Sequence, residues 1–256
     1  MSMTDSAQNI ALANESLALL GAEAITLAAT TEQNYVYCAT FFDDARDEIL
    51  TTHRWNFAKK RAYAIQTIDP LFGYDNAFTP PSDSLKVLQI EQDPAAVFEV
   101  ENALIITDEG TTPSDWVTGT AYLAGEYLRS DDTASGTDLT YLVDTAFTST
   151  ATSETTDLAS YCTSQGADYQ VLEVEYIYQH TTYSTWPVYA RQCNVINLAR
   201  MLAPAIKQNE DAAAKLQAML YGSRKVTGYL DTARSIDAQE GGAVALKTNT
   251  WINARN

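Results

Sequence analysis

The sequence contains few of the residues that carry chemistry in enzymes and metal proteins. Its 256 residues include three cysteines and two histidines. Cys38, Cys162 and Cys193 are far apart and odd in number, and neither a CxxC pair nor a zinc-type Cys/His spacing occurs. His53 and His180 are equally isolated. We therefore predict no metal site and no cofactor, and expect each cysteine to be a small buried or half-buried residue.

The sequence also lacks the short motifs of common enzyme families. GxSxG, HExxH, the P-loop and the dinucleotide fingerprint do not occur. Neighbouring acids are frequent, and a pair of carboxylates is what glycoside hydrolysis requires. A solvated face explains these pairs more simply, since adjacent acids such as Asp43 and Asp44 point in different directions on a helix. The prediction is a protein that is not an enzyme.

Long hydrophobic runs are missing as well. The longest apolar stretches fall far short of the roughly 20 residues that a membrane-spanning helix needs. The first residues, MSMTDSAQNIALANESLALLG, carry no basic region and are already amphipathic, unlike a secretory signal. We expect no membrane contact and folding in a cytoplasm.

Basic residues are scarce. The chain has 33 acidic against 16 basic residues, a net charge of −17. Residues 101–180 hold 14 acids and one base, Arg129, whereas the remaining residues hold 19 acids and 15 bases. An acidic surface repels phosphate, which argues against dedicated nucleic-acid binding by the middle of the chain. It remains compatible with a channel through which DNA passes.

Apolar residues recur at helical spacing in both terminal parts of the chain. We predict helices at residues 5–20, 31–53, 188–206 and 212–239. Pro204 is expected to end or kink the third helix, and Gly222 and Gly228 to weaken the fourth only locally. Trp55 and Phe57 follow the second helix directly, and we expect these rings to fold back onto the helices.

The middle of the chain has the alternation of strands. We predict strands at residues 85–90 and 98–106, with a turn near Asn102, and a third from about residue 171 with Glu173 and Glu175 outward. Between them, a segment rich in Thr, Ser, Asp and Gly carries regularly spaced aromatic rings, which is typical of short β segments separated by turns.

The expected fold class is therefore α+β. We predict a mainly helical bundle with a small antiparallel sheet, an inserted small β module and an extended C-terminal arm. The core comprises residues 1–109 and 170–242, the β module residues 110–169, and the arm residues 243–256.

Five segments together resemble the head-to-tail adaptor proteins of short-tailed bacteriophages, the tail tubular protein A family. They are NIALANESLALLGAEAI, ARDEILTTHRWNFAKKRA, FGYDNAFTPPSDSLKVLQI, VEYIY and YLDTARSIDAQEGG. Each segment alone is common, but their order, and above all the pair WNFAKKRA and PPSDSLKVL, is moderately specific. The resemblance covers most of residues 5–106 and 170–256.

The resemblance implies a structural virion protein located in the neck and tail. Such a subunit forms a dodecameric homo-oligomer ring that binds the portal protein, joins it to the tail nozzle protein and passes genomic DNA without sequence-specific binding. The C-terminal segment of this family commonly reaches into a neighbouring protein, which here implies a portal-docking arm with Lys247, Trp251, Ile252 and Arg255. A frayed terminus is the alternative. Lys59, Lys60 and Arg61 either meet an acidic neighbour across the ring or form a solvated patch.

The insertion carries a second resemblance. WVTGTAYLAGEYL, LTYLVDTAFTS and TTDLA are similar to small β modules of chitin- and cellulose-binding proteins and of many phage structural proteins. This implies glycan stacking by Trp116, Tyr122, Tyr127 and Tyr141, because exposed rings stack on sugar faces. The alternative, which we favour, is that the rings fill the core of a module that is too small to fold otherwise. The alternative function is thus a glycan-binding or glycan-cleaving phage surface protein.

Overall fold

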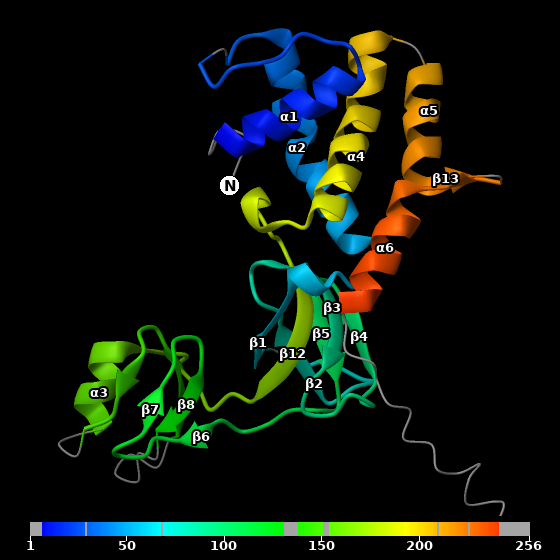
Figure 1. Cartoon of the computed structure of the whole chain (residues 1–256). Coiled ribbons are helices and arrows are strands. Elements are labelled where there is room, and N and C mark those ends of the chain that lie inside the picture. Colours follow the sequence, from blue (N-terminus) through cyan, green and yellow to red (C-terminus); the bar gives the residue numbers. More distant parts are fainter. Residues whose placement is uncertain are drawn as a thin grey trace, which may run out of the picture. The chain divides into compact units, whose positions relative to one another are not determined.

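The computed structural model describes residues 7–28, 30–67, 69–130, 138–150, 154–208, 210–224 and 226–240. It is of mixed α and β class, with 41% helix and 26% strand. The chain divides into two compact units, each described by itself below. The helical unit comprises residues 1–58 and 180–256, and the β unit comprises residues 59–179 (Figure 1).

The helical unit is organised around one central helix. Its helices are α1 (Ala7–Leu19), α2 (Gln33–Thr51), α4 (Val188–Lys207), α5 (Glu210–Tyr221) and α6 (Tyr229–Glu240). The helices α1, α2, α5 and α6 all pack against α4 (Figure 1). Every residue of α4 from Cys193 to Ala199 is buried. A helix that is covered on all sides is the centre of a core and not its edge.

Two predicted helix ends differ from the structure. Helix α4 continues through Pro204 to Lys207, so the proline does not end it. Pro204 is exposed, and water can satisfy the carbonyl group that the missing N–H leaves free. The helix stops instead at Gln208, whose φ of 49° is left-handed.

The prediction of one helix over residues 212–239 is wrong. The chain leaves the helix at Gly222 and forms a short hairpin of β13 (Gly222–Ser223) and β14 (Val226–Thr227) before α6 begins. Gly222 has a φ of +84°, and a Cβ atom on it would lie 2.7 Å from the nitrogen of Gly228. The two glycines permit a backbone contact that any side chain would block, so they break the helix instead of weakening it.

The main sheet of the β unit is antiparallel and six-stranded. Its strands are β1 (Lys59–Gln66), β2 (Asn76–Thr79), β3 (Ser84–Ile90), β4 (Phe98–Glu101), β5 (Leu104–Thr107) and β12 (Val171–Tyr178), in the order β3-β12-β1-β2-β5-β4. The predicted turn near Asn102 is confirmed. Asn102 and Ala103 have φ values of 48° and 63°, as a two-residue hairpin turn requires, and they divide the predicted strand into β4 and β5.

The insertion forms a small β module with its own core. Its elements are β6 (Ser114–Asp115), β7 (Ala121–Tyr122), β8 (Tyr127–Ser130), β9 (Leu139–Val143), β10 (Phe147–Thr148), α3 (Glu154–Tyr161) and β11 (Cys162–Ser164). Short β segments were predicted here, whereas α3 was not. Of its residues only Asp157 and Leu158 are buried, so α3 has too narrow an apolar face to be seen as a helical period.

The division into units differs from the predicted domains. We expected the sheet to belong to a helical core of residues 1–109 and 170–242, but it forms one unit with the module. The reason is the order of strands, because the neighbours β1 and β12 lie at opposite ends of the β unit in sequence and close it. The predicted arm, residues 243–256, lies outside the described residues.

Candidate interaction sites

Three of the five segments named above become neighbouring strands. Strand β12 contains VEYIY and pairs with β1, which begins with Lys59-Lys60-Arg61, and with β3, which follows the Pro80-Pro81 turn. The pairing places Lys60 opposite Tyr176 and Arg61 opposite Glu175. Segments that are 114 residues apart in sequence thus form one continuous surface.

Asp83 is the centre of a polar cluster on these strands. Lys60 Nζ lies 2.7 Å from Asp83 Oδ2, and the Tyr176 hydroxyl donates to Asp83 Oδ1 at 2.8 Å. Burial of the carboxyl group raises its pKa, but the hydrogen bonds from Lys60 and Tyr176 outweigh that effect and the pKa of Asp83 is lowered. Asp83 is therefore held as a carboxylate that joins β1 and β12 to the start of β3.

Arg61 links the same three strands, because it lies on β1 and pairs with an acid on β12 and with an acid directly after β3. Its Nη2 lies 2.7 Å from Glu175 Oε2 and its Nε lies 3.1 Å from Glu91 Oε1. Glu173 is exposed as predicted, but Glu175 is only 6% exposed, so its predicted outward position is wrong. Leu172, Val174 and Tyr176 share one core cluster, so the alternation of β12 continues and Glu175 lies on the other face. Glu175 is buried there because the Arg61 side chain covers it. Lys60 and Arg61 thus have acidic partners within the same chain.

Asp237 is the centre of a polar cluster in the helical unit, as Asp83 is in the β unit. Its carboxylate accepts the backbone N–H of Asn56 at 3.0 Å and the hydroxyl of Tyr189 at 3.1 Å, and it lies 3.3 Å from His53 Nε2. The side chain of Asp237 is 1% exposed. Sequence reasoning missed it, although Leu230, Ala233 and Asp237 follow the buried spacing of a helix. The position of Asp237 on the apolar face of this helix was the signal in the sequence that it is buried.

The aromatic residues after α2 pack as predicted. Trp55 is fully buried, and its indole N–H donates to the carbonyl of Ile49 at 2.8 Å. The rings of His53 and Trp55 meet edge-on with centroids 4.8 Å apart. No partner of His180 was evident in the sequence; in the structure its Nε2 lies 2.9 Å from the Thr185 hydroxyl. Burial lowers the pKa of His180. Both histidine rings pack against aromatic neighbours, His53 against Trp55 and His180 against Trp186.

The four rings predicted to stack on glycans have unequal positions. Tyr122 is 7% exposed, and its hydroxyl accepts the Val117 N–H at 2.7 Å. Trp116 and Tyr141 pack against the same small core of the module. Tyr127 instead meets Tyr63 of the main sheet edge-on, with centroids 6.2 Å apart. Three rings therefore serve the module core, and Tyr127 alone reaches the main sheet.

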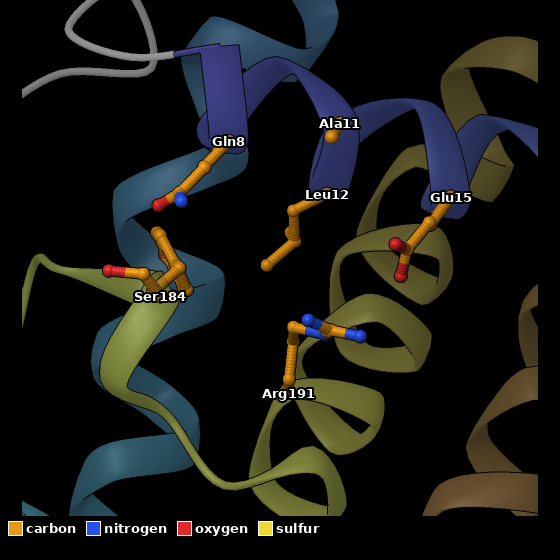
Figure 2. Close-up of a pocket in the computed structure, with 7 residues that line it drawn as sticks. Gln8, Ala11, Leu12, Glu15, Ser184 and Arg191 are labelled. Atoms are coloured by element: carbon orange, nitrogen blue, oxygen red, sulfur yellow. The ribbon is translucent and has the colours of Figure 1, made fainter.

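A small pocket lies between α1, α4 and the turn η3 (Tyr183–Thr185) (Figure 2). Its lining includes Gln8, Glu15, Ser184 and Arg191, and its volume is about 110 Å³. Figure 2 shows Glu15 and Arg191 projecting from α1 and α4. Sites for small molecules generally measure about 300–1,000 Å³. This pocket is therefore much smaller than a typical small-molecule site.

The thiols are poorly suited to nucleophilic chemistry. Burial raises the pKa of Cys38 to about 12 and is the main cause that raises those of Cys162 and Cys193 to about 11. A nucleophilic cysteine needs a lowered pKa. Within the described parts of the chain, no three His, Cys, Asp or Glu side chains are grouped to hold a metal ion.

Two further expectations concern the C-terminal arm and the absence of a membrane-spanning helix. The docking residues Lys247, Trp251, Ile252 and Arg255 lie outside the described residues. Among the helices that the structure describes, none is both long and apolar enough to cross a membrane.

No protein-family model matches the chain, and no curated protein matches it.

Proposed function

We propose that this chain is a structural subunit of the head-to-tail adaptor ring of a short-tailed bacteriophage. Twelve copies bind the portal protein, join it to the tail nozzle protein and surround the path of the genomic DNA. The subunit acts mechanically and not as an enzyme, and its place is the neck of the virion.

One observation carries this proposal. The segments whose order resembles the adaptor family are joined by direct contacts within each unit. KKRA, VEYIY and SDSLKVLQI are adjacent strands linked by Asp83 and Arg61. WNF and the closing helix are linked by Asp237. The resembling segments therefore form shared surfaces and are not scattered over the fold, which is consistent with the resemblance.

The charge of the β unit is consistent with a DNA passage. Its 121 residues hold 20 acidic and 5 basic residues, a net charge of −15, whereas the helical unit holds 13 acidic and 11 basic residues, a net charge of −2. A wall that repels phosphate lets DNA pass without sticking. The Lys60 and Arg61 charges are already paired with carboxylates, so they offer DNA little attraction.

Native mass spectrometry tests the proposal. The chain is measured alone and mixed with the portal ring of the same phage. One bound copy per portal subunit is expected, and deletion of residues 243–256 is expected to abolish attachment while the fold is kept. A folded chain that does not associate with the portal contradicts the adaptor function.

A second candidate function is glycan binding, and one observation favours it. Tyr63 lines an open hollow of about 230 Å³ on the main sheet together with Arg61, Glu91 and Glu173. Tyr127 packs edge-on against Tyr63 beside this hollow. Rings next to charged and polar groups are the usual components of sugar sites. Binding of cell-wall sugars that is lost in Tyr63→Ala, with the fold intact, would support this function, and absence of binding by the wild type would exclude it.

A further inference from the structure

The loop between β1 and β2 carries two apolar side chains that are almost fully exposed. Leu71 is 97% exposed and Phe72 is 87% exposed. We call this pair the knob. Large apolar side chains that stand adjacent and uncovered commonly mark a contact with another protein.

The base of this loop is tied down. The Thr67 N–H donates to the Ala77 carbonyl at 2.8 Å, and the Gln66 side chain donates to Asp69 and Asn76 at 3.0 and 3.1 Å. The knob therefore projects from a closed hairpin. A projection whose base is fixed loses less conformational entropy on binding than a free loop.

Acidic residues flank the knob. Asp69 and Asp75 are exposed on its two sides. They belong to the unit that carries a net charge of −15. The partner that covers the knob therefore needs an apolar floor and a basic rim.

The helical unit has a groove with these properties. Its volume is about 300 Å³, and it lies where the end of α1, the end of α4 and the start of α5 meet (Figure 1). Leu20 and Leu216 form its floor and are 5% and 9% exposed, whereas Leu19 stands at its edge and is 46% exposed. Leu19 also lines a second hollow of about 150 Å³ with Met219 and Tyr229, which extends the apolar surface.

The rim of the groove is basic. Lys207 and Lys215 line it and are both exposed. Neither lysine is among the ion pairs that the described residues form. Two lysines beside an apolar floor are the complement of two aspartates beside an apolar knob.

We propose that the knob of one copy inserts into the groove of a neighbouring copy, with Asp69 and Asp75 placed against Lys207 and Lys215. Because knob and groove are different surfaces, the contact is heterologous and repeats from copy to copy, as a ring requires. The inference rests on the proposed function, because this interface would build the ring of the adaptor. Its test does not require the portal.

Disulfide trapping tests which surfaces meet. Phe72→Cys and Leu19→Cys chains are purified separately, mixed and oxidised, and covalent dimers are counted on a non-reducing gel. A dimer that forms in the mixture is expected, and a ladder of higher species is expected when one chain carries both substitutions. Val226→Cys is the matched control, because Val226 is 65% exposed on the same unit but away from the groove lining. Equal yield with the control, or no dimer, overturns the proposal.

A charge exchange tests the pairing. Lys207→Glu with Lys215→Glu, and separately Asp69→Lys with Asp75→Lys, should each weaken self-association by about tenfold or more in sedimentation velocity. A chain with all four substitutions should regain association. Failure of the combined chain to recover, while its circular dichroism is unchanged, overturns the pairing.

These outcomes are separable from those of the adaptor test. A chain that binds the portal but gives no specific dimer keeps its adaptor function and loses this interface. A chain that gives the specific dimer but ignores the portal keeps the interface and loses the adaptor function.

Discussion

The Asp237 carboxylate accepts the Asn56 backbone N–H at 3.0 Å, and the Asn56 side chain donates to the Asp237 carbonyl at 2.7 Å. This reciprocal pair joins the turn after α2 to α6 across 181 residues of sequence. The same carboxylate contacts His53 and Tyr189. This buried carboxylate therefore holds together the turn after α2, the start of α4 and the end of α6.

Asp237→Asn should therefore destabilise the helical unit. The substitution removes a buried charged acceptor and leaves at least one donor without a good partner, which costs about 2 kcal/mol. The free energy of unfolding by urea, followed by circular dichroism at 222 nm, measures the effect. Asp231→Asn on the same helix is the control, since Asp231 forms a surface pair with Arg234 and its side chain is 55% exposed. A loss of equal size in both variants would contradict the role of the buried cluster.

Asp83→Asn should make the β unit less sensitive to acid. The folded pKa of Asp83 lies below its ordinary value of 3.8. The carboxylate therefore stabilises the fold above that value, and the stabilisation is lost as the pH falls through the folded pKa. Hydrogen exchange of β1 and β12 should be faster in the variant than in the wild type at pH 7, and the difference should shrink near pH 2. Glu173→Gln, an exposed site on β12, is expected to show no change at either pH.

Gly222, at the β13–β14 hairpin, and Gly119, in the inserted module, separate two causes of strain. Gly222→Ala introduces both a positive φ and a clash with the Gly228 backbone, whereas Gly119→Ala introduces a φ of +76° with nothing within 4 Å. We expect Gly119→Ala to cost about 1 kcal/mol and Gly222→Ala clearly more. Thermal unfolding of the two variants compares them. Equal losses would show that the close backbone approach between α5 and α6 contributes nothing.

Trp116→Ala should lower the stability of the module. The ring packs against the core of Tyr122, Leu128, Val143, Phe147 and Leu158. Removing a large, half-buried ring leaves a gap that costs about 2–3 kcal/mol. Limited proteolysis of residues 110–169 reads out the loss. If the variant is as resistant as the wild type and has lost sugar binding, the ring is a ligand contact and not a core residue.

The native thiols should be slow to react with Ellman's reagent at pH 8. The pKa values of about 12 for Cys38 and about 11 for Cys162 and Cys193 leave little thiolate at that pH. All three should react in 8 M urea. A rapidly reacting thiol in the native chain would contradict the burial of these residues and would complicate the trapping experiment.

The sequence by itself determined the main elements. The apolar spacing from Tyr35 to Leu50 and the alternation from Val171 predicted α2 and β12, because burial on one face leaves a period that can be counted. The turn at Asn102 was likewise visible, since few residues accept a positive φ. The packing of Trp55 followed from its position directly after a helix.

The tertiary structure decided what depends on partners distant in sequence. The burial of Glu175 required Arg61 on a neighbouring strand, and the burial of Asp237 required Asn56, which is 181 residues away in sequence. The break at Gly222 depends on the backbone contact with Gly228, which is close in sequence but is made only in the folded chain. A charge or a glycine has no local period that marks such a role. The surroundings of such a residue exist only after distant segments have packed together. For the same reason only the tertiary structure exposes the knob and forms the groove.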